Sequence, residues 1–179
     1  MSRNSPQSRG IQWNRRVFIE AGLAAAVAAS PACSHSSGSG EWRFFTPEQA
    51  ETVEAICSQL IPTDVSPGAK EAGVVHYIDL QLKLRFKKYR AVYTKGIEET
   101  DTTSGSKFGK RFVALASDQQ VELLTELEEK LKSFFDLILT HTRQGFYGDP
   151  RHGGNRGRVS WKMVGLPTPP VRGREHYPA

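Results

Sequence analysis

The sequence has few cysteines and no long apolar run. Cys33 and Cys57 are the two cysteines in 179 residues, too few for a disulfide scaffold, a zinc ribbon or an iron–sulfur site built from cysteine alone. No apolar run reaches the roughly 18 residues that a membrane-spanning helix needs. These shortages argue against a cysteine-built metalloprotein and a multi-pass membrane protein, and the length favours one domain.

Motifs typical of cofactor binding or catalysis are also missing. Gly153 and Gly154 neither follow an expected strand nor precede an expected helix, so they do not form a dinucleotide or phosphate fingerprint. No Cys-x-x-Cys-His motif is present to attach a c-type haem. The histidines His76, His141 and His152 lack metal-ligand spacing. We therefore expect no catalytic residue, no bound cofactor and no metal in this chain.

Two possible reactive groups have a structural interpretation that we prefer. Cys57 lies on the apolar stripe of an expected helix, where a buried thiol is a better interpretation than a nucleophile. Asp149 and His152 could form an acid–base pair, but Asp149 followed by Pro150 is typical of a turn. Neither group indicates catalysis.

Positive charge is concentrated at the two ends of the chain. The formal net charge is +5. Residues 1–33 contribute +3 and residues 150–179 contribute +5, so the segment between them carries −3. A nucleic-acid-binding domain would instead need a basic stripe on its folded body. The charge distribution therefore argues against a nucleic-acid partner.

Residues 1–32 have the pattern of a cleavable export signal. A basic segment precedes an Ala-rich apolar stretch over residues 17–29, and small residues follow. Arg15 and Arg16, with Phe18 close behind, resemble a twin-arginine signal, although Glu20 replaces the usual basic residue. An ordinary secretory signal with two chance arginines is the alternative. Both interpretations predict an exported, periplasmic protein.

Cys33 stands at the possible start of the mature chain. It follows the small residue Ala32, and residues 33–41 form a Ser/Gly-rich flexible tether. A lipid on Cys33 would hold the protein at the periplasmic face of the inner membrane. Against lipidation, Ser30 occupies a position where a lipidation motif has Leu. Cleavage nearby without a lipid, leaving a soluble periplasmic protein, is the other interpretation.

Residues 42–147 are expected to form a helical body. Thr46, Pro47 and Gln49 predict a helix start with a capping box, and apolar residues at 3–4 spacing continue to Ile61 before Pro62 ends the helix. A second apolar face begins at residue 74 and is expected to continue as one long helix to residue 93. Residues 101–107 are expected to form a polar linker.

The second half of the body shows the same helical periodicity. Residues 117–120 predict another capping box, and an apolar face follows over residues 121–131. A last apolar run begins at residue 134 and ends with Phe146 and Tyr147. Alternation typical of strands is poor. The sequence therefore predicts an all-α fold, a small irregular bundle of four to five helices.

Residues 148–179 differ from the body in composition. Glycine, proline and arginine dominate up to residue 158, and a continued helix is not expected there. Apolar residues including Trp161 then return. We interpret the segment as a long C-terminal docking arm and tail, because structureless segments of this length are usually functional or disordered.

Six sequence elements resemble the gluconate 2-dehydrogenase subunit 3 family, and together they cover most of residues 42–167. They are WRFFTPE at 42–48, IPTD at 61–64, PGAKEAGV at 67–74, GFYGDP at 145–150, GGN at 153–155 and VSWKMVG at 159–165. The C-terminal elements are the most specific. Proteins of this family are the small, gamma subunits of membrane-associated flavin dehydrogenases.

The resemblance implies a non-catalytic accessory subunit. Similar subunits accompany a large FAD-dependent dehydrogenase of the glucose–methanol–choline type, often with a multihaem cytochrome c. The small subunit carries the twin-arginine signal and is thought to escort the folded flavoprotein through the twin-arginine translocon. FAD is then expected in the partner, and haem c in a third subunit. A stand-alone periplasmic lipoprotein with a structural or binding role is the alternative.

We predict that the arm provides the main contact with the flavoprotein, because aromatic and arginine side chains dominate interface hot spots. Docking of the arm on its own body is the alternative. The predicted interface residues are Phe146, Tyr147, Gly148, Asp149, Pro150, Arg151, Gly153, Gly154, Asn155, Arg156 and Trp161.

Overall fold

The computed structural model describes residues 42–166. These residues fall in the second of the two units into which the chain divides, 1–37 and 38–179. The predicted export signal with Arg15, Arg16 and Phe18, and the possible lipidation site Cys33, lie outside the described residues, as does the tail from residue 167.

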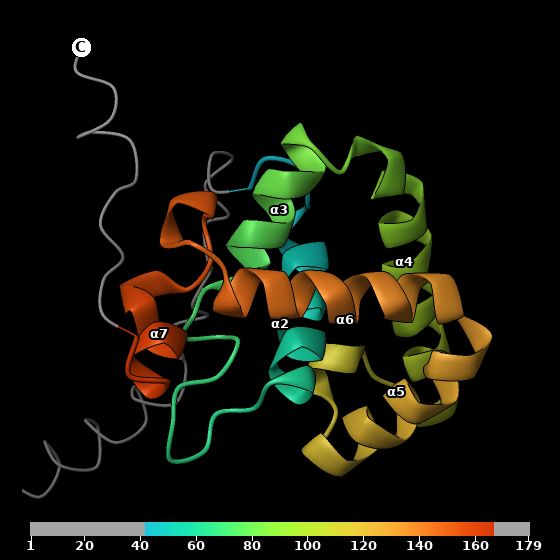
Figure 1. The fold of residues 1–179 in the computed structure, drawn as a ribbon. Helices are drawn as coiled ribbons and strands as arrows, with labels where there is room; N and C mark the ends of the chain where they lie inside the picture. Colours follow the sequence, from blue (N-terminus) through green and yellow to red (C-terminus); the bar gives the residue numbers. More distant parts are fainter. Residues whose placement is uncertain (1–41, 167–179) are drawn as a thin grey trace, which may run out of the picture. The chain divides into compact units, whose positions relative to one another are not determined.

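All regular secondary structure among the described residues is helical, with no strand, which confirms the all-α prediction (Figure 1). The α-helices are α2 (Pro47–Leu60), α3 (Val74–Leu84), α4 (Arg90–Phe108), α5 (Ser117–Lys130), α6 (Lys132–Tyr147) and α7 (Val159–Met163). Four 3-10 turns join them, η1 (Lys87–Tyr89), η2 (Phe112–Ala114), η3 (Pro150–His152) and η4 (Arg156–Arg158). Five helices form the body, and the short α7 is an additional helix inside the predicted arm.

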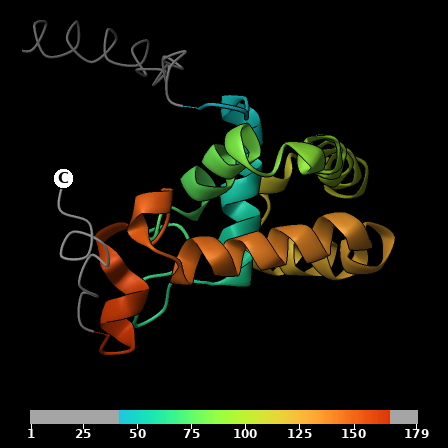
Figure 2. The same ribbon diagram turned by 45° about the horizontal axis from the view of Figure 1, so that its top comes forward.

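Helices α2 and α6 form the centre of the bundle. Helix α2 packs against α3, α4, α5 and α6 (Figures 1 and 2). Helix α6 packs against α2, α3, α4, α5 and α7. The core side chains between them come from positions 45 to 146 and include Val53, Ile56, Ile78, Leu82, Tyr93, Phe112, Leu123, Ile138 and Phe146. Burying each such side chain contributes about 1.5–3 kcal/mol, so this core stabilises residues 42–147.

The first predicted helix start is confirmed. Thr46 Oγ1 accepts a hydrogen bond from the Gln49 backbone N–H at 3.2 Å, and Gln49 Oε1 accepts from the Thr46 N–H at 3.1 Å. The second predicted capping box is wrong in register. Helix α5 begins at Ser117, so Ala116 precedes it and has no side-chain oxygen; only Gln119 Oε1 binds, accepting from the Ala116 N–H at 3.2 Å.

The prediction of one long helix from residue 74 to residue 93 is also wrong. Helix α3 ends at Leu84, and the chain turns through η1 before α4 begins. The side chain of Arg90 explains the break, because its Nε donates to the Leu82 carbonyl at 2.8 Å and its Nη2 to the Lys83 carbonyl at 3.2 Å. A cation at the last carbonyls of a helix stabilises the helix end.

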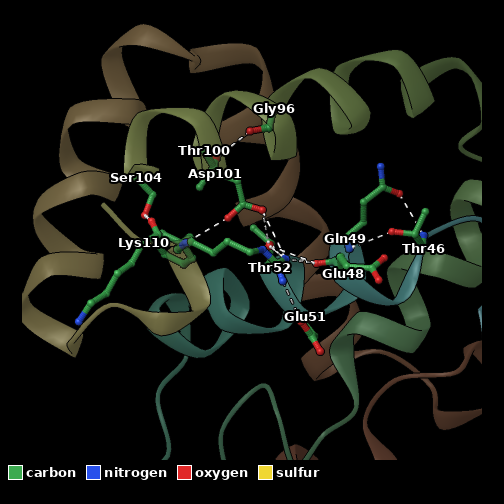
Figure 3. Close-up of polar contacts among 12 residues, drawn as sticks. Thr46, Glu48, Gln49, Glu51, Thr52, Gly96, Thr100, Asp101, Ser104 and Lys110 are labelled. Carbon is green, nitrogen blue, oxygen red and sulfur yellow. Dashed lines mark hydrogen bonds and ion pairs between the residues drawn. The ribbon is translucent and has the colours of Figure 1, made fainter. Parts of the chain in front are cut away.

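Residues 101–107 form the last two turns of α4 and not a polar linker. Their polar side chains find partners within the fold (Figure 3). Asp101 accepts hydrogen bonds from Thr52 Oγ1 and from the Phe112 N–H, both at 3.0 Å, and Ser104 Oγ donates to the Lys110 carbonyl at 2.6 Å. The polar composition of residues 101–107 therefore reflects a face of α4 that forms hydrogen bonds with α2 and η2.

Arg111 completes this polar network between α2, α4 and η2. Its guanidinium donates to the Glu48 carbonyl at 2.9 Å and to Glu51 at 3.2 Å, and lies 3.5 Å from an Asp101 oxygen. A helix with few apolar residues, such as α4, is held to the bundle by these contacts in addition to the buried Tyr93 and Ile97.

Candidate partner-binding site

The segment after α6 folds back onto the body of the protein. Helix α6 ends at Tyr147, η3 packs against α3, and α7 packs against α6 (Figure 2). The Trp161 indole Nε1 donates to the Tyr147 carbonyl at 3.0 Å. This is the self-docking arrangement that the sequence left open as the alternative.

Asn155 holds this segment together. Its side chain is fully buried, and its backbone is left-handed, with φ of 44°. Its Nδ2 donates to the Gly148 carbonyl at 2.9 Å, and its Oδ1 accepts from the Ser160 N–H at 3.1 Å. Asparagine tolerates the left-handed region better than most residues. One side chain thus links the end of α6 to the start of α7.

Two neighbouring backbone contacts fix the segment to the body. The Arg156 N–H donates to the Ala72 carbonyl, in the turn before α3, at 3.0 Å. Gly154 lies against Gly145 on α6, where an added Cβ would come within 2.2 Å of the Gly145 carbonyl oxygen. Only glycine permits so close an approach of two backbone segments.

Asp149 closes a turn and does not pair with His152 as an acid–base couple. Its carboxylate accepts from the Arg151 backbone N–H at 2.9 Å and from the guanidinium of Arg151 at 2.7 and 3.0 Å. These contacts with Arg151 lower the pKa of Asp149 to about 2. The carboxylate is therefore ionised at neutral pH, and the turn interpretation fits the structure.

An open groove of about 410 Å³ lies between the end of α2, the loop that follows it, α6 and α7. We call it the C-terminal groove; it is lined by Leu60, Ile61, Pro62, Asp64, Ser66, Pro67, Leu139, Arg143, Phe146, Tyr147 and Met163. Tyr147 is 55% exposed and Met163 48%. Val65, Val164 and Leu166 are further exposed apolar residues from the same loop and the end of α7. An exposed cluster of apolar side chains is typical of an interaction surface.

The structure divides the predicted interface residues into two groups. Phe146, Gly154 and Asn155 are buried within the chain and contact its own body. Tyr147, Arg151 and Arg156 are exposed, and Gly148, Asp149, Pro150, Gly153 and Trp161 are half-buried. The exposed and half-buried residues remain predicted partner contacts.

Several groove residues were missed by sequence reasoning. Leu60, Leu139 and Arg143 sit on helices whose inner faces were assigned to the core, and Met163 lies on the unexpected α7. The Ile-Pro-Thr-Asp element from residue 61 could have indicated this surface, because a distinctive motif in a loop often has a binding role.

The buried titratable groups have structural contacts. His141 lies parallel to the rings of Phe86 and Tyr93, with centroids 4.3 and 5.8 Å away, and its Nδ1 is 2.9 Å from the Tyr93 hydroxyl. Burial lowers the pKa of His141 to about 4. The imidazole is therefore neutral at neutral pH and part of an aromatic stack.

Cys57 and Asp79 likewise serve the fold. The Cys57 Sγ is buried 3.2 Å from Thr142 Oγ1, and burial raises its pKa to about 12, which fits the predicted core thiol. Buried Asp79 accepts the backbone N–H groups of residues 43, 44 and 45 at 2.8–3.0 Å. Within residues 42–166, no group of three His, Cys, Asp or Glu side chains could hold a metal ion.

Fold and groove together define a small all-helical protein with an exposed surface suited to a protein partner. The family model for gluconate 2-dehydrogenase subunit 3 matches residues 47–167, and the chain belongs to that family. No curated protein and no solved structure matches the chain. No helix among residues 42–166 is long and apolar enough to cross a membrane.

Replacing Asn155 with Ala should release the C-terminal segment. We expect a loss of about 3 kcal/mol in the free energy of unfolding, because one buried and one half-buried hydrogen bond disappear and Ala disfavours positive φ. Asn155→Gly should lose about 1 kcal/mol less, since glycine adopts this backbone freely. Urea unfolding measures the stability, and trypsin cleavage after Arg156 and Arg158 measures release of the segment. The exposed Thr102→Ala should change neither; an Asn155→Ala protein as resistant as the wild type would contradict the assignment.

His141 should make the protein sensitive to acid. Its pKa is about 4 in the folded chain against 6.5 for an ordinary histidine, so the unfolded chain binds more protons between these values. Stability is therefore expected to fall as the pH falls from 6.5 to 4, by up to about 1.4 kcal/mol per pH unit. His141→Gln should flatten the curve in this window, and exposed His152→Gln should not. Parallel curves for the wild type and His141→Gln would show that another group dominates.

Proposed function

We propose that this protein is the non-catalytic accessory (gamma) subunit of a periplasmic or membrane-associated FAD-dependent dehydrogenase complex that oxidises a sugar, sugar acid or alcohol. The observation that carries the proposal is membership of the gluconate 2-dehydrogenase subunit 3 family over residues 47–167. The name of the family describes one subunit among several, so a dehydrogenase partner follows from it.

Two features of the structure support a binding role for this chain. His141, Cys57 and Asp79 are committed to packing and hydrogen bonds inside the bundle. In the C-terminal groove, by contrast, Tyr147 and Met163 are exposed to solvent, and each is carried by a helix that packs in the fold. A preformed surface with exposed aromatic and apolar anchors loses little conformational entropy on binding.

In this proposal the catalytic partner is a flavoprotein of the glucose–methanol–choline type, with FAD in that subunit and haem c in a third, cytochrome subunit. The small subunit stabilises the flavoprotein and escorts it, already folded, through the twin-arginine translocon. The sequence of residues 1–32 supports this role, since paired arginines precede an Ala-rich apolar stretch. A lipid on Cys33 would keep the complex at the periplasmic face of the inner membrane.

Capture of partners from periplasm and solubilised membrane tests the proposal. A tagged wild-type chain should retain a yellow flavoprotein, identified by mass spectrometry and by its flavin absorption. Tyr147→Ala and Met163→Ala should each weaken binding by about 2 kcal/mol, or about 30-fold in Kd, if they are hot spots in the C-terminal groove. Val121→Ala is the matched control, because Val121 is 49% exposed on α5 and outside the groove.

The outcomes separate the two functions. A chain that purifies alone under all conditions would favour the stand-alone periplasmic lipoprotein. A flavoprotein retained equally by wild type, Tyr147→Ala and Met163→Ala would keep the accessory role and place the interface elsewhere. The melting temperatures of the isolated variants show whether a loss of binding reflects misfolding.

Export should depend on the paired arginines. Changing Arg15 and Arg16 together to Lys should leave the precursor in the cytoplasm and strand the flavoprotein with it, because the twin-arginine route requires this pair. Cell fractionation and blotting for both proteins measure the effect, and Arg9→Lys serves as the control. Normal export of the double variant in a strain without the twin-arginine translocon would rule out this route.

A further inference from the structure

The turn between α3 and α4 carries a concentrated positive charge. Residues 83–90, which we call the basic corner, contain Lys83, Arg85, Lys87, Lys88 and Arg90 and no acidic residue. The other described residues hold 13 basic and 16 acidic side chains. The basic corner therefore has the opposite sign to the rest of the described unit.

The break between the two helices places these charges in a turn. In a single long helix the eight residues would form about two turns, with the five charges spread around the axis. Instead, α3 stops at Leu84 and η1 redirects the chain, so the five residues belong to the turn between α3 and α4, which lies at the top of the view in Figure 1. Arg90 holds the turn through the carbonyls of Leu82 and Lys83.

The remaining four basic side chains of the corner are exposed, and none forms an ion pair with a described carboxylate. Among them, Lys88 lies over the Tyr89 ring, with Nζ 4.8 Å from its centroid. Leu84 is 56% exposed in the middle of these charges. Behind them, the ring of Phe86 packs on buried His141, so the turn is anchored to the core.

We propose that the basic corner binds the surface of an anionic phospholipid membrane, with the basic side chains at the headgroup phosphates and Leu84 inserted between them. Clusters of four or more Lys and Arg near a membrane bind anionic lipids, and each contributes about fivefold in affinity. An apolar side chain within a basic face adds burial at the boundary between headgroups and acyl chains. The proposal rests on this surface and is independent of the proposed dehydrogenase partner.

The composition of the corner favours lipid over an acidic protein surface. Three of its four unpaired bases are lysines. Lysine is depleted and arginine enriched in protein–protein interfaces, whereas diffuse attraction to a charged lipid surface needs only the charge. The protein interface proposed above, the C-terminal groove, is formed by other residues.

Vesicle sedimentation tests the proposal with residues 38–179, the compact unit that holds the described core. This chain lacks both the export signal and Cys33, so neither can bind lipid in its place. We expect binding to vesicles of equal parts phosphatidylglycerol and phosphatidylcholine, and little binding to pure phosphatidylcholine. Combining Lys83→Ala, Arg85→Ala, Lys87→Ala and Lys88→Ala should weaken binding about 100-fold or more. Leu84→Ala alone should give a smaller loss that persists at high salt.

The matched control removes the same charge elsewhere, with Lys70→Ala, Lys95→Ala, Lys110→Ala and Lys132→Ala on exposed positions. It should retain most of the binding, and circular dichroism verifies that both fourfold variants stay helical. Equal binding to the two kinds of vesicle, or an equal loss in both fourfold variants, would overturn the proposal. If the fourfold basic-corner variant still binds the anionic vesicles but no longer captures the flavoprotein, the corner is a protein interface.

Discussion

The side chain of Asn155 is the contact on which the arrangement of the C-terminal half depends. It joins the Gly148 carbonyl at the end of α6 to the Ser160 N–H at the start of α7. Because the amide is fully buried, each lost hydrogen bond would leave a backbone group without a partner in the interior. With Asn155 in place, α7 is held beside the end of α6, so Met163 on α7 and Tyr147 on α6 line the C-terminal groove together.

Helix α3 and the turn before it contact both the start of the described chain and the segment after α6. Asp79 on α3 accepts three successive N–H groups from residues 43–45, which tie the start of the unit to the bundle. The turn before α3 supplies the Ala72 carbonyl to Arg156, and η3 packs against α3 itself. Charge-assisted hydrogen bonds to one buried carboxylate are stronger than neutral ones. The start of the unit is thus held by a carboxylate on α3, and the segment after α6 by a backbone carbonyl in the turn before α3.

Packing and charge divide the described surface into two regions with separate proposed roles. The C-terminal groove presents apolar and aromatic side chains beside Arg143, as expected of a surface that docks a protein. The basic corner presents lysines and Leu84 at the opposite end of α3 from Ala72, as expected of a surface that meets anionic headgroups. A subunit with both regions could hold a catalytic partner close to a membrane.

Local sequence determined the helical class, the start of α2 just after its N-cap Thr46, and the end of α6 at Tyr147. Helix periodicity, capping residues and glycine all act over a few residues. The family motifs also located the segment from Phe146 to Trp161. Tertiary contacts decided the rest. Asp101 and Ser104 continue α4 because Thr52 approaches from α2 and the chain after α4 folds back to bring Lys110 and Phe112 against them. Arg90 ends α3 by reaching back to the Leu82 carbonyl. Asn155 is buried only because the end of α6, the start of α7 and the turn before α3 meet around it, and no local pattern carries that information.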